Sequence, residues 1–145
     1  MCFFNKIRKL KSPILAVDGL LVKGDKVLLV RRNIEPFQGC WVLPGGHVRY
    51  GEKVEEAIKR EMKEELGLEV KVRKLLGVYS DPKRDPRYHV VSLAFLLNRN
   101  KGEIRLNEEA SEFKYFSLNR LPSKIGFDHH QIINDFKQQK NVRRI

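Results

Sequence analysis

The chain has 145 residues, of which 41% are hydrophobic and 32% charged, and its formal net charge is +11. This length predicts a single domain, residues 1–145, with a hydrophobic core of its own. No apolar run approaches the roughly 18 residues that cross a bilayer, and the first residues lack the order of a signal peptide. We therefore expect a cytoplasmic protein without membrane contacts. Two cysteines, Cys2 and Cys40, are too few for a disulfide framework or a zinc site, so both are expected to be free thiols.

The excess of positive charge attracts polyanions such as nucleotides, nucleic acid or an acidic membrane surface. Much of this charge lies at the two ends, in Lys6–Lys11 and Lys137–Ile145. Solvated tails that aid solubility explain it at least as well as binding does. We interpret residues 1–11 and 138–145 as basic terminal tails.

The first half of the chain predicts a β-hairpin, a short strand and a helix. Pro13–Arg32 contains two β-rich runs around the turn "KGDK". A short strand around Trp41–Leu43 is followed by a Pro-Gly-Gly break. A helix is expected from about Glu52 to Leu66, with Gly51 as N-cap and Gly67 in the left-handed position that ends helices.

The second half predicts more strands and a closing helix. Leu68–Ser80 alternates like a strand, Asp81–Arg87 is a loop, and Tyr88–Leu97 is a long buried strand. A further strand, Glu112–Leu118, precedes a helix over His129–Gln139. Strands mixed with two helices indicate the α/β class, with a mixed sheet covered on both faces.

One face of the first helix changes character along its length. Val54, Ile58, Glu61 and Glu65 are spaced by four, three and four residues, so they form one stripe that begins apolar and ends in two carboxylates. Glu64 lies about 60° from Glu61 on the same geometry. Glu56, Lys59, Arg60 and Lys63 fall on the opposite side, where water is expected.

Carboxylates on a core-facing stripe need a partner. Burying an ionised carboxylate alone costs several kcal/mol or more. A divalent cation held by hard oxygen ligands resolves this cost and suits Mg²⁺ or Mn²⁺. The alternative is a solvated helix in which Arg60 pairs with Glu56 or Glu64.

The same residues form a recognisable motif. From Gly46 the chain reads Gly, five residues, Glu52, seven residues, Arg60-Glu61-Met62, one residue, Glu64-Glu65, one residue, Gly67-Leu68. This pattern resembles the Nudix box at every defining position. The resemblance implies a Nudix-type α/β/α sandwich with a mixed β-sheet between helices. It also implies hydrolysis of a nucleoside diphosphate linked to another moiety.

The resemblance assigns roles by motif position. Glu61, Glu64 and Glu65 would bind the metal, Mg²⁺ with Mn²⁺ as a substitute, and the Gly46 carbonyl is a fourth candidate ligand. Arg60 would orient the glutamates with help from Glu52, which places both residues, with Glu61, in the catalytic group.

In related enzymes the general base is a box glutamate or an acid in a later loop. Glu108, Glu109 and Glu112 occupy such a loop here. We favour Glu109, because similar enzymes carry an acid about this far before an aromatic strand.

Several residues outside the box are candidates for substrate binding. Arg31 and Arg32 end a strand that leads to the site, and one of them is expected to bind phosphate, since guanidinium suits bidentate phosphate contacts. Alternation alone does not say which. Arg49, Arg87 in the Asp81–Arg87 loop, and Asp128, which can also cap the last helix, are the other candidates. The four histidines, at positions 47, 89, 129 and 130, are interpreted as structural or surface residues.

The flanks "EPFQGCWVLPGGHV", "SDPKRDPRYHVVSLAFLL" and "FDHH" look like the ADP-ribose pyrophosphatase-like branch of the family. That resemblance implies cleavage of ADP-ribose, or a similar nucleotide sugar, to AMP and ribose 5-phosphate. A nucleoside triphosphate pyrophosphohydrolase for damaged or surplus nucleotides is the first alternative; dinucleoside polyphosphates and capped RNA ends are others. A non-catalytic nucleotide or nucleic-acid binding module would not need all three glutamates. We therefore expect a small nucleotide substrate and not nucleic acid as the partner, and leave a homodimer open.

Overall fold

The computed structural model describes residues 11–142. Within them, two helices flank a seven-stranded sheet with the order β3-β2-β1-β6-β5, in which β4 pairs with β1 and β7 with β2. The strands are β1 (Ile14–Lys23), β2 (Lys26–Arg32), β3 (Trp41–Val42), β4 (Gly45–His47), β5 (Glu69–Tyr79), β6 (Val90–Lys101) and β7 (Ala110–Ser117), and the helices are α2 (Val54–Leu66) and α3 (His129–Val142).

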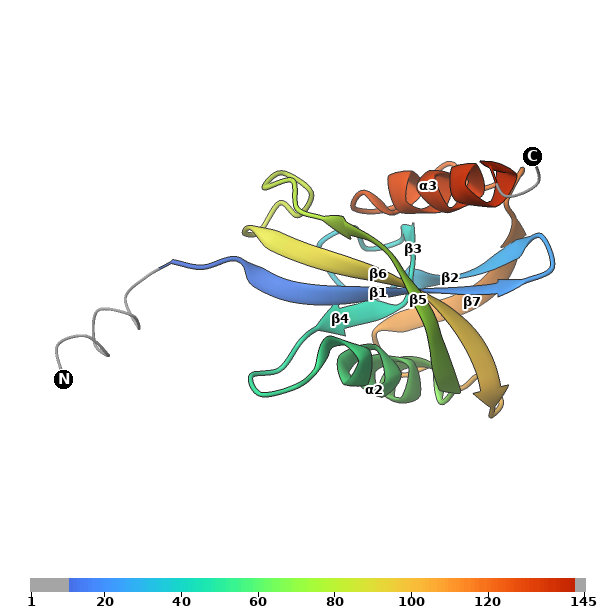
Figure 1. Cartoon of the computed structure of the whole chain (residues 1–145), viewed down its shortest axis with the longest axis horizontal. Coiled ribbons are helices and arrows are strands. Elements are labelled where there is room, and N and C mark those ends of the chain that lie inside the picture. The colour runs from blue at the N-terminus through green and yellow to red at the C-terminus, as the bar shows by residue number, and fades with distance from the viewer. Residues whose placement is uncertain (1–10, 143–145) are drawn as a thin grey trace, which may run out of the picture.

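The sheet is mixed, and helices cover both of its faces. β1 is parallel to β6 over eight residue pairs and antiparallel to β2 and β4. α2 lies on one face and α3 on the other (Figure 1). The expected α/β/α sandwich is therefore confirmed. Neither described helix is long and apolar enough to pass through a bilayer.

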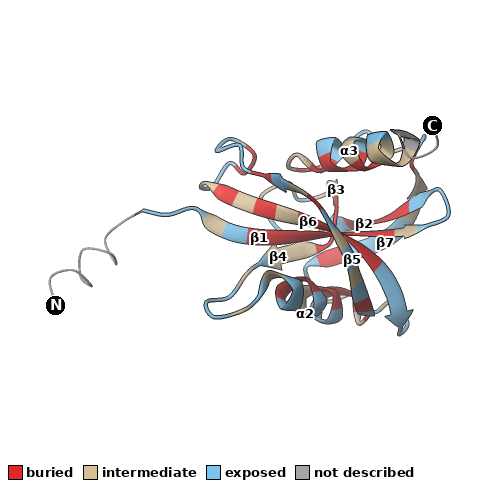
Figure 2. Cartoon of the chain, viewed as in Figure 1, coloured by how far each residue is buried: buried red, intermediate tan, exposed pale blue. Residues whose placement is uncertain are grey.

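Alternating side chains of β1 supply two separate cores. Val17 and Leu21 point to the α2 side, where they join Ile58 and Met62, which are fully buried. Leu20 points to the α3 side and belongs to the second core, with α3 residues such as Ile132. Each such side chain contributes about 1.5–3 kcal/mol when it leaves water. Figure 2 shows the buried residues concentrated between the layers.

The pairing of β1 also opens the space for a site. One edge of β1 is bonded to β6 along residues 14–21. The other edge is shared, because β4 pairs with Ala16–Asp18 and β2 pairs with Val22 and Lys23. β2 and β4 therefore diverge from the middle of β1.

The start of α2 differs from the prediction. The helix begins at Val54 with Lys53 at the N-cap position and no side-chain cap. Gly51 is not the cap; it lies in the preceding turn with φ 81°. Glu52 precedes the helix, and its carboxylate accepts two hydrogen bonds from Arg60. The predicted end is confirmed, since Gly67 is left-handed with φ 70°.

Three further boundaries needed correction. Gly45–His47 is a strand, although a break was predicted at Pro44-Gly45-Gly46, because glycine lets this backbone lie against β1. β6 continues past the predicted end at Leu97 to Lys101, and its last four residues are exposed. The prediction stopped early because it followed the apolar residues alone. α3 continues to Val142, so residues 138–142 are helical and not a tail. Cys40 is a free thiol as expected, whereas Cys2 and the remaining tail residues lie outside the described part.

Candidate active site

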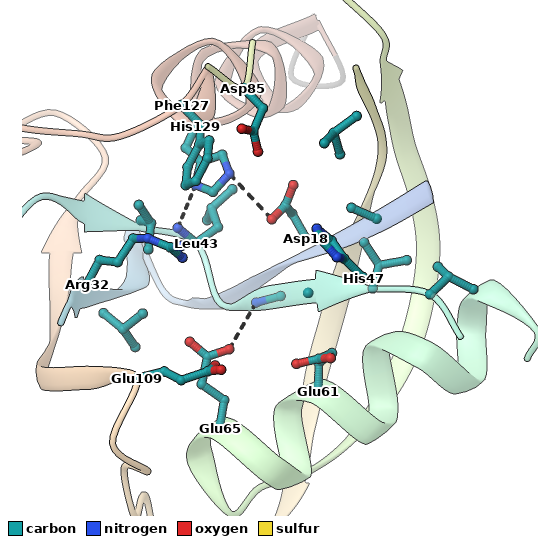
Figure 3. A pocket seen from close by; sticks show the side chains of 18 of the residues that line it. Asp18, Arg32, Leu43, His47, Glu61, Glu65, Asp85, Glu109, Phe127 and His129 are labelled. Carbon is teal, nitrogen blue, oxygen red and sulfur yellow. Dashed lines mark hydrogen bonds and ion pairs between the residues drawn. The ribbon is translucent and has the colours of Figure 1, made fainter. Parts of the chain in front are cut away.

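A cavity of about 460 Å³ lies where β2 and β4 diverge, bounded by α2, the loop between β5 and β6, and the start of α3. Its chemistry differs between two sides of β4 (Figure 3). Glu61, Glu65 and Glu109 lie on one side, and Asp85 and His129 on the other.

The predicted stripe of α2 ends in this cavity. Glu65 is only 6% exposed, and burial raises its pKa to about 8, helped by the negative charges of Glu109 and Glu61. The N–H of Gly45 opposes this shift by donating a hydrogen bond of 3.2 Å to Glu65 Oε2. Burial also raises the pKa of Glu61, although Arg60 acts in the opposite direction. Both carboxylates therefore lie inward, as the helical spacing predicted.

Arg60 does not point into water, which corrects its predicted position on the solvent face. Its side chain is 17% exposed and lies among carboxylates. It donates to Glu52 at 2.7 and 3.0 Å, to Glu61 at 2.8 Å and to Glu64 at 3.2 Å. The hydrogen bonds that Glu52 accepts from Arg60, followed by that from the N–H of Arg49, lower the pKa of Glu52 to about 2. The long side chain folds along the helix and bridges all three acids, a placement suited to orienting Glu61 and Glu64.

The acids are not gathered around a common point in this arrangement. Among the described residues, no three His, Cys, Asp or Glu side chains converge closely enough to hold a metal ion. Glu61 is turned to Arg60, and Glu64 to both Arg60 and Arg49, the latter at 3.3 Å. Metal binding by Glu61, Glu64 and Glu65 thus stays a prediction.

Two glycines allow the backbone of β4 to lie close to these acids. A Cβ on Gly46 would lie 2.4 Å from Cδ of Glu61, and a Cβ on Gly45 would lie 2.1 Å from the carbonyl oxygen of Val17. Both distances are shorter than atoms tolerate. Glycine at these positions is needed because β4 passes between β1 and the α2 carboxylates.

Replacing Gly46 with alanine should displace the Glu61 carboxylate, because that end of the side chain is what the new methyl group meets. We expect kcat to fall about 10- to 100-fold, since small misplacements of reacting groups have such effects. Stability should change little, because a carboxylate can rotate away. Steady-state kinetics and thermal unfolding check this pair of outcomes; wild-type activity in Gly46→Ala would show that the position of Glu61 does not matter.

Of the three loop acids, the structure brings one to the cavity. Glu109 lines it and lies near Glu65 (Figure 3). Glu112 instead forms an ion pair with Arg31 at 3.4 Å. The loop is fixed by Asn33, which donates from its backbone to the Glu109 carbonyl and from its side chain to the Glu108 carbonyl.

The two arginines at the end of β2 have separate surroundings. Arg32 lines the cavity, and its guanidinium lies 5.3 Å from the Phe127 ring. Burial, followed by the nearby charge of Arg87, lowers the pKa of Arg32. Arg31 is not among the residues that line the cavity, because its side chain turns to the Gly39 carbonyl and to Glu112. Of this pair, only Arg32 is placed to meet a ligand in the cavity.

The remaining substrate-binding candidates also separate. Arg49 and Arg87 line the cavity. Asp128 does not line it, because its carboxylate receives two hydrogen bonds from Arg84, at 2.9 and 2.6 Å. Asp128 contacts α3 through its backbone, since its carbonyl oxygen accepts from the N–H groups of Gln131 and Ile132.

A buried polar cluster beside the cavity was not predicted. Asp18 of β1 is 7% exposed and accepts a hydrogen bond from Ser92. Arg84 Nη2 and His129 Nε2 lie 3.6 and 3.4 Å from its carboxylate. Burial alone would raise the pKa of Asp18, but His129, Ser92 and Arg84 together hold it below its ordinary value. The one signal in the sequence was an aspartate within the apolar run "LAVDGLLV".

His129 is buried at the wall of the cavity, and its tautomer follows from its contacts. The N–H of Leu43 donates to Nδ1 at 2.9 Å, so Nδ1 carries no proton. The ring proton is then on Nε2, which faces Asp18. This arrangement joins β1, α3 and the segment before β4, and so fixes one wall of the cavity.

The model of the NUDIX domain matches residues 13–136, which is most of the chain. The chain belongs to the Nudix family. This Nudix chain is 52% identical to the ADP-ribose pyrophosphatase of Methanocaldococcus jannaschii, covering 94% of the chain and 80% of that protein. It is 34% identical to a putative 8-oxo-dGTP diphosphatase of Bacillus subtilis, covering 81% and 75%. The crystal structure of a MutT NUDIX hydrolase from Burkholderia pseudomallei superposes with a TM-score of 0.80 at 29% identity, covering 86% and 98%.

Proposed function

We propose that this Nudix hydrolase cleaves the pyrophosphate bond of ADP-ribose, or of a similar nucleoside-diphosphate sugar, and releases AMP and ribose 5-phosphate. The observation that carries the proposal is the 52% identity, over 94% of the chain, to an ADP-ribose pyrophosphatase. The cavity supports the proposal in two ways. The acids on one side could hold a divalent cation that binds phosphates, and the polar groups on the other side suit sugar hydroxyls.

The acidic side has the chemistry of a site for a divalent cation. Its donors are the hard oxygens of Glu61, Glu64 and Glu65, with the Gly46 carbonyl as the predicted fourth ligand, and such ligands suit Mg²⁺ or Mn²⁺. The pKa of Glu65, raised to about 8, indicates negative charge that the protein alone does not compensate. A bound Mg²⁺ would neutralise phosphate oxygens and acidify water.

Residues of the chain provide the other parts of the reaction. A water molecule attacks one phosphorus of the pyrophosphate, the bond from that phosphorus to the bridging oxygen breaks, and the second phosphate leaves with the electron pair. Glu109 accepts the proton of the attacking water. Arg32 binds phosphate oxygens, since its side chain donates to the backbone carbonyls of Glu35 and Pro36 and, within residues 11–142, forms no ion pair with a carboxylate.

A substrate panel tests the proposal. Purified protein with Mg²⁺ should hydrolyse ADP-ribose with the highest kcat/KM among ADP-ribose, NADH, dinucleoside polyphosphates and nucleoside triphosphates. AMP and ribose 5-phosphate should appear in equal amounts. No hydrolysis of ADP-ribose would reject the proposal.

The 34% identity to a putative 8-oxo-dGTP diphosphatase favours one alternative, a nucleoside triphosphate pyrophosphohydrolase. Release of inorganic pyrophosphate from 8-oxo-dGTP, at a higher kcat/KM than the cleavage of ADP-ribose, would establish it. If the protein were a non-catalytic binding module, no substrate of the panel would be hydrolysed. Cytoplasmic location and a homodimer stay predictions from the sequence.

A further inference from the structure

The loop between β5 and β6, residues 80–89, forms the side of the cavity that faces away from the glutamates. Its Asp85 side chain lines the cavity although only 3% of it is exposed. Figure 3 shows Asp85 near His129, on the opposite side of β4 from Glu61 and Glu65. A nearly buried carboxylate at this position needs a partner within the protein or in a ligand.

The two arginines of this loop that line the cavity, Arg84 and Arg87, are both paired with carboxylates. Arg84 forms ion pairs with Asp128 at 2.6 Å and Asp18 at 3.6 Å. Arg87 pairs with Asp85 at 2.9 Å. Both guanidinium groups are therefore already paired with carboxylates. This part of the cavity has no surplus positive charge to attract a phosphate, and it suits an uncharged polar group.

Hydrogen-bonding capacity is nevertheless left over. Asp85 Oδ1 accepts from the N–H and Nε of Arg87, at 2.9 and 3.1 Å, whereas Oδ2 accepts a single hydrogen bond from the part of the chain that the structure describes, from Nη2 of Arg87 at 2.9 Å. A carboxylate oxygen can accept two hydrogen bonds, so Oδ2 has room for another donor. Within residues 11–142, the contacts of Arg84 with Asp128 and Asp18 use Nε and Nη2, which leaves Nη1 as a donor on a residue that lines the cavity.

An acceptor beside a donor matches a hydroxyl group, which both donates and accepts, better than a phosphate, which mainly accepts. We propose that Arg84, Asp85 and Arg87 form a sugar subsite in which Asp85 accepts a hydrogen bond from one of the vicinal hydroxyls of a ribose. The subsite rests on the proposed function and specifies what this loop recognises. Both the adenosine ribose and the terminal ribose of ADP-ribose offer that chemistry.

The subsite is held in place before substrate arrives. Arg84 connects the loop to α3 through Asp128 and to β1 through Asp18. Arg87 packs on the Tyr88 ring, 4.9 Å from its centre, and so orients Asp85 from the other side. Arg87 acts here as a positioning residue, Arg84 holds the loop and supplies the donor, and Asp85 accepts the hydrogen bond from the hydroxyl.

The test compares wild type and Asp85→Asn on ADP-ribose and on two analogues, one without the 2′-hydroxyl of the adenosine ribose and one without the 2″-hydroxyl of the terminal ribose. On ADP-ribose, Asp85→Asn should lower kcat/KM about 10- to 100-fold, mainly through KM, as expected for a hydrogen bond to a charged group. With one analogue the two enzymes should become equal, because the partner of Asp85 is then missing. That analogue identifies the ribose.

Asp81→Asn is the matched control, since Asp81 lies in the same loop, is exposed and does not line the cavity. It should behave like wild type on every substrate. An equal loss on ADP-ribose and both analogues, or no loss at all, would overturn the subsite. If wild type cleaves nucleoside triphosphates and not ADP-ribose, the proposed function fails separately. ATP and dATP then provide the comparison, and an Asp85→Asn effect of the same size on both would overturn the subsite.

Discussion

Glu109→Gln should lower kcat about 10²- to 10⁴-fold, the usual contribution of a positioned general base. The carboxylate lies in the cavity near Glu65, and glutamine keeps its size but cannot accept the proton. The fold should be spared, because Glu109 is held through its backbone, with Asn107 Oδ1 accepting its N–H at 3.0 Å and Asn33 bonding its carbonyl. Steady-state kinetics at saturating Mg²⁺, with a thermal unfolding curve, measure both expectations.

Glu108→Gln and Glu112→Gln are the controls for this variant. Neither residue lines the cavity, and Glu112 is half exposed in its ion pair with Arg31. Both variants should keep kcat within about twofold of wild type, as expected for surface changes away from the site. Near-wild-type turnover in Glu109→Gln, or a large loss in either control, would assign the base to another residue.

The α2 part of the site could be predicted because it depends only on the helical repeat of about 3.6 residues per turn. A helix fixes which side chains share a face, so the spacing of Val54, Ile58, Glu61 and Glu65 placed the two acids inward without knowledge of the sheet. The same rule was wrong for Arg60. The direction of the Cα–Cβ bond does not determine where the end of a long side chain lies. The Arg60 side chain starts on the solvent face, but its guanidinium group binds Glu52 and Glu61.

The other side of the cavity depends on contacts that no local pattern encodes. Asp18, Arg84 and His129 lie on β1, a loop and α3, and only the packing of these elements brings them together. Alternation likewise did not distinguish Arg31 from Arg32, because the β2–β7 pairing shifts register between these two residues. Charged residues in apolar surroundings, such as Asp18, were the signal available.

Glu65→Gln should remove a pH dependence from the stability of the metal-free protein, in addition to abolishing activity. The pKa of Glu65 is about 8 in the folded chain, against an ordinary 4.5. Between these values the folded state keeps a proton that the unfolded state releases, so the free energy of unfolding falls as pH rises from about 4.5 to about 8. At about 1.4 kcal/mol per pKa unit, the loss is on the order of 3 to 5 kcal/mol. Glutamine resembles the protonated acid and has no proton to lose.

Metal binding should reverse this effect, because a carboxylate must release its proton to bind Mg²⁺. The rise in Tm on adding Mg²⁺ should therefore be larger at pH 8 than at pH 6 in wild type and absent in Glu65→Gln. Glu56→Gln is the matched control, an exposed glutamate of the same helix, and should follow wild type. Thermal unfolding in chelator and in Mg²⁺ across this pH range measures both effects. Parallel curves for wild type and Glu65→Gln would show that Glu65 neither carries the proton nor binds the metal, and the acidic side of the cavity would then need another explanation.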